Sequence, residues 1–430
     1  MSSMSFVKRS IARGGLAAVL VGALAGVSAC APTPEPASSP SAAPSTSAPE
    51  PYDGPLLFVG DELESFALTP QEVAGLFPGA PPATAITDTL VQYADGGGPD
   101  FAPAVCRLLI SETSMRSVGA RTVPWVDGAD AGNSGRQEIL QFASEENASA
   151  RMDDLVSTVE SCAQFDAQGP GSFTASVAPD GDGVRAFAGT LELDSSGSPW
   201  RAHHAFAAVG NVIVHAWQPA QDGSAFDAEA AALLLRDRAV EAKTALVDEL
   251  TAQPPVTPTP SAQDPSADWS TWELTPTGVG PLIFGADRAA ALAAVPGATA
   301  EEFTWTDTAA RLVSPDGQSS LILHFTEDGA RLSGVTAGIA NLDGDVEPNG
   351  DLLPAAQGVR IGAPLADAVA AFPDGTFLQI VSSGEDFYQW ATREGGVVRF
   401  RADRDAADPA AVITGITVED ATLTPPLTVD

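Results

Sequence analysis

The side chains best suited to chemistry in this chain are two histidines on neighbouring predicted strands. His204 and His215 flank the dipeptide Gly210-Asn211, which is typical of a tight turn between antiparallel strands. Counting outward from that turn places His204 opposite Trp217 and His215 opposite Phe206, so both imidazoles face the same side of the sheet on a diagonal. Such a pair could take part in catalysis, bind a metal ion or line a ligand site.

A zinc site would need at least three protein ligands, and the sequence identifies no acid on a neighbouring strand as the third. Two interpretations remain for His204, Phe206, His215 and Trp217. They either pack as semi-buried aromatic residues in the core, or they line a cleft whose mixed apolar and polar surface suits a small ligand. We take the cleft as the candidate ligand-binding site, with His203 pointing to the opposite face.

An acidic segment between Asn341 and Asp351 is a second candidate. It places Asp343, Asp345 and Glu347 at alternate positions, and calcium binds such oxygen ligands. The EF-hand pattern fails, however, because Pro348 stands where that loop needs glycine and the distal glutamate is missing. A calcium site and a solvated loop both stay open.

Known catalytic motifs are absent from the sequence. It contains no Gly-x-Ser-x-Gly elbow, His-Glu-x-x-His helix or phosphate loop, and its one Ser-x-x-Lys match, Ser5–Lys8, lies at the N-terminus within residues predicted below to be a signal peptide. A carboxylate pair for glycoside hydrolysis cannot be singled out among 56 acidic residues. We therefore expect a protein that is not an enzyme and needs no cofactor.

The charge balance restricts the partners of this 430-residue chain. It holds 21 basic and 56 acidic residues, a formal net charge of −35 at pH 7. Nucleic acid and anionic lipid surfaces are disfavoured, because both require Lys and Arg to displace counterions. The excess of acid suits cationic ligands or basic protein patches, and it also promotes solubility.

The N-terminus has the layout of an export signal. Basic residues up to Arg13 precede an apolar stretch, and the small residues Val27-Ser28-Ala29 stand directly before Cys30. This pattern resembles the lipobox of bacterial lipoproteins, in which the cysteine is acylated and becomes the mature N-terminus. The resemblance implies a signal peptide over residues 1–29 and a lipid anchor on the outer face of the cell membrane. An ordinary signal peptide with a chance cysteine is the alternative.

Exported proteins work in an oxidising compartment, so Cys106 and Cys162 are expected to be oxidised. We predict one disulfide, stabilising the fold by about 4 kcal/mol because the closed loop is long. A catalytic or metal-binding pair is the alternative, but the cysteines lack Cys-x-x-Cys spacing and a neighbouring histidine. A predicted helix at about 148–162 carries Cys162 on its apolar stripe, so the bridge would fasten the buried face of that helix.

Two spacers rich in proline divide the chain. Residues 30–55 and 252–267 have a composition that cannot bury a core, so both are predicted to be extended. They separate two globular regions, 56–251 and 268–430, each predicted to be α+β. Beyond the signal, no apolar run approaches the roughly 20 residues of a membrane-spanning helix.

In the first region, Thr69 and Glu72 form a capping box around Pro70, which predicts a helix that ends at Phe77-Pro78. The other elements are predicted from hydrophobic periodicity. They are a short helix at 104–109, a strand at 139–143, the helix at 148–162, strands at 184–193, 200–209 and 212–218, and a final helix at 227–250.

The second region contains an internal repeat. The segment Phe284–Pro296 matches Ile361–Pro373 at an offset of 77 residues, with the glycines and the final prolines aligned. The repeats cover about 278–345 and 355–425. Each copy is predicted as a helix followed by antiparallel strands, at 321–325 and 335–339 in the first copy and at 397–402 and 411–418 in the second. Two copies packed together could form one continuous sheet with the helices on one side.

The first region resembles the extracellular sensor domain of PknH-type bacterial receptor kinases. The matching features are the Leu-Thr-Pro-Gln-Glu-Val start of the helix at Pro70, the helix cysteines Cys106 and Cys162, Trp200, and the His-Ala-Trp motif ending at Trp217. The chain departs from that family in having cysteines for one disulfide where the kinase domain has two, and in lacking an attached kinase. The resemblance implies a module that binds or senses a ligand in a cleft between helices and sheet.

The second region resembles the tandem helix-plus-sheet repeats of β-lactamase inhibitory proteins and of small envelope-assembly lipoproteins. In those relatives the sheet face binds a protein, which implies a partner surface here, with Trp305, Tyr388 and Trp390 as its candidate aromatic residues. Taken together, we predict a non-enzymatic, membrane-anchored lipoprotein that binds an unidentified small ligand or senses an envelope signal. The alternative is a protein-binding or inhibitory module that holds an envelope protein through the repeat sheet.

Overall fold

The computed structural model describes most of the chain beyond the predicted signal and first spacer. The described residues are 50–93, 100–110, 113–126, 134–195, 198–220, 225–256, 259, 261–340 and 349–426. Cys30 and the acidic residues Asp343–Glu347 lie outside them, so the predictions of lipidation and of calcium binding stay predictions.

A seven-stranded antiparallel sheet forms the centre of the first region, in the order β2-β3-β8-β7-β6-β5-β4. Its strands are β2 (Gly119–Trp125), β3 (Gly135–Gln141), β4 (Phe165–Asp166), β5 (Pro170–Val177), β6 (Arg185–Ser195), β7 (Ser198–Val209) and β8 (Val212–Pro219). The turn between β7 and β8 is Gly210-Asn211, as predicted, and Gly210 has the left-handed φ of 56° that this tight turn requires. The strands β2, β4 and β5 were not predicted from the sequence.

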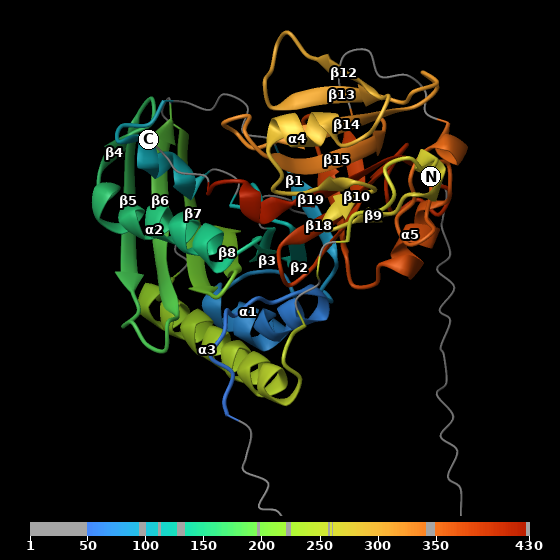
Figure 1. Ribbon diagram of the computed structural model, residues 1–430. Helices are drawn as coiled ribbons and strands as arrows, with labels where there is room; N and C mark the ends of the chain where they lie inside the picture. Colours follow the sequence, from blue (N-terminus) through green and yellow to red (C-terminus); the bar gives the residue numbers. More distant parts are fainter. Residues whose placement is uncertain are drawn as a thin grey trace, which may run out of the picture. The chain divides into compact units, whose positions relative to one another are not determined.

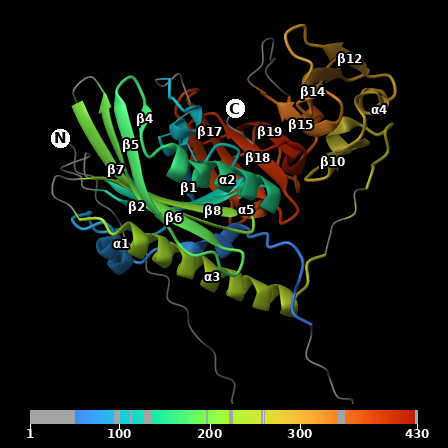
Figure 2. The same ribbon diagram turned by 90° about the vertical axis from the view of Figure 1, so that its left-hand side faces the viewer.

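Helices cover both faces of this sheet (Figures 1 and 2). On one face lie η1 (Gly60–Phe66), α1 (Pro70–Leu76) and α3 (Ala228–Ala252), and on the other lie η2 (Ala104–Leu109) and α2 (Glu145–Ser161). Successive strand residues point to opposite faces, so Ile139 packs in the α3 layer and Leu140 in the α2 layer.

The helices begin where their capping residues stand. Thr69 accepts a hydrogen bond from the backbone N–H of Glu72 at 3.2 Å, and the Glu72 carboxylate accepts one from the backbone of Thr69 at 2.7 Å, which confirms the predicted capping box. Ser144 caps α2, which therefore starts a few residues earlier than the apolar stripe indicated. The disulfide between Cys106 and Cys162 is present, with Cα atoms 5.5 Å apart, and joins η2 to the end of α2. That prediction is confirmed.

The second region is built on a nine-stranded sheet in the order β1-β16-β17-β18-β19-β15-β14-β13-β12. Its strands are β1 (Thr89–Gln92), β12 (Thr299–Glu302), β13 (Ala309–Val313), β14 (Ser320–Phe325), β15 (Leu332–Gly338), β16 (Thr376–Ile380), β17 (Glu385–Ala391), β18 (Gly396–Ala402) and β19 (Ile413–Asp420). The two repeats meet where β15 pairs with β19, so the predicted continuous sheet is confirmed. Each repeat contributes four strands rather than the two predicted.

The repeat helices α4 (Arg288–Ala293) and α5 (Leu365–Ala371) start 77 residues apart, as do β12 and β16. Gly285 and Gly362, which precede these helices, both have left-handed φ values, 82° and 87°, so the matched glycines serve the same turn. Both helices pack on the same apolar core. A small sheet completes that core, with strands β9 (Leu274–Thr275), β10 (Gly278–Val279) and β11 (Leu282–Ile283).

A strand of the first region joins the sheet of the second. β1 pairs in parallel with β16, and Leu90 lies opposite Leu378. Beside it, the buried Arg121 on β2 donates hydrogen bonds to the carbonyl oxygens of Asp374 and Gly375 at 2.9 and 3.1 Å. The chain from Pro49 onward therefore forms one compact unit. Within the described residues, no helix has the length and apolar composition needed to cross a membrane.

Candidate functional site

The histidines lie where the turn-based count predicts. His204 pairs with Trp217 and Phe206 with His215, and all four side chains lie on the α2 face of the sheet. The rings of Phe206 and His215 stack at 4.3 Å between centroids, and those of His204 and His215 at 5.4 Å. His203 points to the other face, where it stacks on another aromatic ring.

These side chains belong to the core and do not form the wall of an open cleft. His204 is 4% exposed, His215 is 8% exposed and Phe206 is fully buried, while Trp217 is half-buried beneath the guanidinium of Arg136 at 5.1 Å. The packing of α2 and of the segment at Thr113 against this face accounts for the burial. The interpretation of His204, Phe206, His215 and Trp217 as semi-buried core aromatics therefore describes the structure better than the cleft.

The structure adds polar partners that sequence reasoning missed. Glu138 on β3 lies opposite His215, with its carboxylate 3.9 Å from Nδ1, and it accepts a hydrogen bond from Arg136 at 2.6 Å. Thr113 lies 3.4 Å from the same Nδ1, and His215 Nε2 lies 3.1 Å from His204 Nδ1. The sequence does show Arg136 and Glu138 at alternate positions, which puts both side chains on one face of a strand. It does not show that this strand pairs with β8, and only that pairing brings Glu138 next to His215.

Burial keeps this histidine cluster neutral. It lowers the pKa of His204 to about 3, with a contribution from the charge of His203, and it lowers the pKa of His215 well below its usual range. The Nε2 atom of His204 has no hydrogen-bond partner within the described part of the chain. No group of three or more His, Cys, Asp or Glu side chains that could hold a metal ion occurs among the same residues.

The cluster predicts a pH-dependent stability. Because the folded-state pKa of His204 lies below the ordinary value, its stabilising contribution is complete above pH 6.5 and is lost as the pH falls from 6.5 toward 3. We expect His204→Asn, which cannot titrate, to reduce the slope of unfolding free energy against pH in this range by up to about 1.4 kcal/mol per pH unit. Urea unfolding between pH 4 and 7 measures the slope, and identical slopes for variant and wild type would contradict the neutral assignment.

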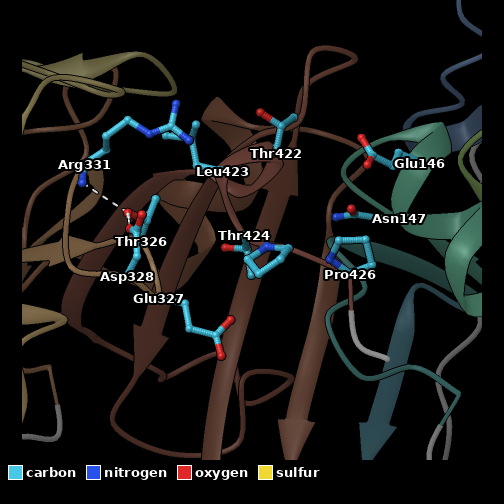
Figure 3. A pocket seen from close by; sticks show the side chains of 11 residues that line it. Glu146, Asn147, Thr326, Glu327, Asp328, Arg331, Thr422, Leu423, Thr424 and Pro426 are labelled. Atoms are coloured by element: carbon cyan, nitrogen blue, oxygen red, sulfur yellow. Dashed lines mark hydrogen bonds between the residues drawn. The ribbon is translucent and has the colours of Figure 1, made fainter. Parts of the chain in front are cut away.

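An open groove with a volume of about 600 Å³ lies between α2 and the repeat region (Figure 3). One wall is the first turn of α2, another is the turn that follows β14, and the third is the segment that follows β19 through η6 (Ala421–Leu423). The lining residues are Glu146, Asn147, Thr326, Glu327, Asp328, Arg331, Thr422, Leu423, Thr424, Pro425 and Pro426. We call this cavity the groove.

Local hydrogen bonds fix the walls of the groove. In the turn after β14, the Asp328 carboxylate accepts hydrogen bonds from the Thr326 hydroxyl at 2.5 Å and from the backbone of Ala330 at 3.1 Å. These bonds hold the pKa of Asp328 below its ordinary value. Asp420 accepts from the backbone of Thr422 at 3.1 Å at the start of η6. The groove is therefore a formed cavity rather than a gap between free loops.

Asn147 presents a side-chain amide to the groove. Its side chain points from α2 into the groove and is 9% exposed, yet its amide makes no hydrogen bond to any described residue. On the opposite side, the guanidinium of Arg331 extends into the groove and forms no ion pair within the described chain. Glu146, the neighbour of Asn147, is exposed and points the same way. None of these residues was singled out from the sequence.

The aromatic residues predicted to bind a protein partner do not form one surface. Trp305 is 56% exposed and lies beside Phe303 in the connection between β12 and β13. Tyr388 is 1% exposed, and its hydroxyl accepts a hydrogen bond from the backbone of Gly375, so it belongs to the core. Trp390 is half-buried against Phe372, at 5.4 Å between ring centroids.

Comparison with known proteins assigns no family to the chain. No family model matches the sequence, and no curated protein matches it. Among solved structures, the chain is similar to an uncharacterised protein from Mycobacterium smegmatis described as the Rv0999 ortholog. The sequences are 13% identical, the match covers 44% of this chain and 97% of the other, and the TM-score is 0.25. At this TM-score the similarity carries no argument about fold or function.

Proposed function

We propose that this protein is a lipid-anchored protein of the bacterial cell envelope that binds a small polar ligand in the groove without transforming it. The observation that carries the proposal is the side-chain amide of Asn147, which reaches into the groove and makes no hydrogen bond to a described residue. A ligand that donates to this amide and accepts from it takes the place of water there and is held in a fixed orientation.

The sequence around Cys30 supports the location. The resemblance of residues 1–30 to an export signal that ends in a lipobox cysteine supports a location on the outer face of the membrane, and the Cys106–Cys162 disulfide is consistent with an oxidising compartment. The resemblance of the first region to PknH-type sensor domains supports a role in ligand binding or sensing. A sensing role would require a second protein to carry the signal onward.

The lining of the groove supports recognition as its role. It offers an amide, hydroxyls, carboxylates and one guanidinium around a small apolar area formed by Leu423, Pro425 and Pro426. Concave sites with a few placed polar groups fix the orientation of small ligands. The histidine cluster, by contrast, is covered by α2, and we propose a structural role for it.

If Asn147 serves a ligand and not the fold, replacing it should change stability little. We expect Asn147→Leu to leave the free energy of unfolding within about 0.5 kcal/mol of the wild-type value, because the amide makes no hydrogen bond to a described residue and leucine has the higher helix propensity. Urea unfolding of variant and wild type, each free of ligand, measures the change.

Ser157→Leu, at an exposed position of α2 away from the groove, is the matched control and should change stability by only a few tenths of a kcal/mol. If Asn147→Leu lowered the free energy of unfolding by 1 kcal/mol or more, the amide would stabilise the ligand-free fold, and the proposed role of Asn147 in ligand binding would be wrong.

A further inference from the structure

We infer that the groove binds a zwitterionic ligand of the short-peptide class, whose carboxylate pairs with Arg331 and whose ammonium group pairs with Glu146. The inference rests on the proposed function and adds to it the chemical class of the ligand. It depends on two charges of opposite sign that form no ion pair with a described residue and lie at opposite walls of one cavity, Arg331 and Glu146, and on the side-chain amide of Asn147, which lies beside Glu146 on α2.

Arg331 provides the positive wall. Acidic residues outnumber basic ones 56 to 21 in this chain, and most arginines of the described residues pair with a carboxylate. Arg331 is an exception, since its guanidinium has no carboxylate within ion-pair distance and no hydrogen bond in the described part of the chain, although its charge helps to lower the pKa of the nearby Asp328. A planar guanidinium matches a carboxylate with two parallel hydrogen bonds, so a ligand carboxylate is its best complement.

Glu146 provides the negative wall. It projects from the first turn of α2 on the side of the groove opposite Arg331, and it forms no ion pair with any described residue. Glu327 lines the groove as well, whereas the Asp328 carboxylate is occupied by the hydrogen bonds of its own turn. Arg116 and Arg151 line a small cavity with Asn147 and Pro426, so a cationic group on the ligand is favoured only beside the carboxylates of Glu146 and Glu327.

Asn147 lies beside Glu146, so its amide would contact the peptide group next to the ammonium end of the ligand. A carboxamide carries both a donor and an acceptor, which is the complement of a peptide group. The groove, at about 600 Å³, lies in the range of small-ligand sites and is larger than one amino acid requires. A short peptide therefore suits the amide of Asn147, and its two termini carry the charges that complement Arg331 and Glu146.

Ligands with one charge fit less well. A ligand whose only charge is a carboxylate pairs with Arg331 and leaves Glu146 without a partner, and a ligand whose only charge is cationic pairs with Glu146 and leaves Arg331 without one. Specificity of this kind arises as much from unpaired or repelled charges as from attraction. The zwitterion pairs both walls at once.

The test compares trialanine with its singly charged derivatives by isothermal titration calorimetry on the whole protein. Trialanine is expected to bind, and N-acetyl-trialanine and trialanine amide are each expected to bind about fivefold more weakly, which corresponds to the loss of one solvent-exposed ion pair. Arg331→Gln should abolish the preference for trialanine over its amide, and Glu146→Gln should abolish the preference over the N-acetyl form. Glu160→Gln, at an exposed position near the other end of α2, should change neither preference.

Each outcome has a defined meaning. Equal binding of all three peptides, or no binding of trialanine, overturns the zwitterion inference. The proposed function survives either result if a ligand isolated with the wild-type protein is lost in Asn147→Leu, because that experiment does not depend on the ligand's charge. Preferences that persist unchanged in Arg331→Gln and Glu146→Gln also overturn the inference, since the charges would then be recognised elsewhere.

Discussion

Replacing Cys106 and Cys162 together with alanine is expected to lower the free energy of unfolding by about 4 kcal/mol. The bridge spans 56 residues, so its loss returns a large conformational entropy to the unfolded chain. The disulfide also fastens the end of α2, whose first turn forms the helix wall of the groove. Urea unfolding of the double variant and of the oxidised wild type measures the effect.

The reduced wild-type protein is the control for this prediction. It keeps both sulfur atoms in the core but lacks the covalent link, so it should match the double variant to within about 1 kcal/mol. Equal stability of the oxidised and reduced wild type would show that the bridge contributes nothing beyond the packing of its buried side chains.

Arg121→Met is expected to lower the free energy of unfolding by about 4 kcal/mol. The side chain of Arg121 is buried, and its guanidinium donates hydrogen bonds to the carbonyl oxygens of Ala120, Asp374 and Gly375, which methionine leaves unpaired. Each hydrogen bond to a charged group contributes about 1.5–3 kcal/mol, and the apolar part of methionine recovers some of the packing. Because Asp374 and Gly375 precede β16, the variant weakens the junction where β1 joins the nine-stranded sheet.

Arg121 forms ion pairs with two carboxylates, Asp61 and, at 4.0 Å, Glu64, and Asp61→Asn separates the backbone role from the shorter of the two. Asp61 lies 3.3 Å from the guanidinium but is mostly exposed, and exposed ion pairs contribute less than about 1 kcal/mol. We therefore expect Arg121→Met to lower the free energy of unfolding strongly and Asp61→Asn to lower it only slightly. A large loss in both variants would assign the stabilisation to the ion pair instead.

Local and repeated signals of the sequence predict much of the fold. The turn at Gly210-Asn211 determines the register of β7 with β8, and the match of Phe284–Pro296 with Ile361–Pro373 predicts the shared sheet of the repeats. Strands with weak patterns were missed. β12 has no buried residue, so its sequence shows no apolar alternation.

Features that depend on long-range pairing could not be predicted. β1 is four residues long, and nothing in it indicates a parallel partner nearly three hundred residues away. Glu138 reaches His215 only because β3 pairs with β8. The groove combines α2 with two segments of the second region, so its residues share no sequence pattern. Tyr388 shows the same limit, since its burial depends on which face of β17 meets the core.

The central claim is that the groove holds a small ligand through Asn147. Native mass spectrometry of the protein purified in mild detergent from its own host, as wild type and as Asn147→Leu, tests it most directly. The proposed function predicts a small non-covalent adduct on the wild type that is absent from the variant. A wild-type protein without an adduct, or the same adduct on both proteins, would contradict it.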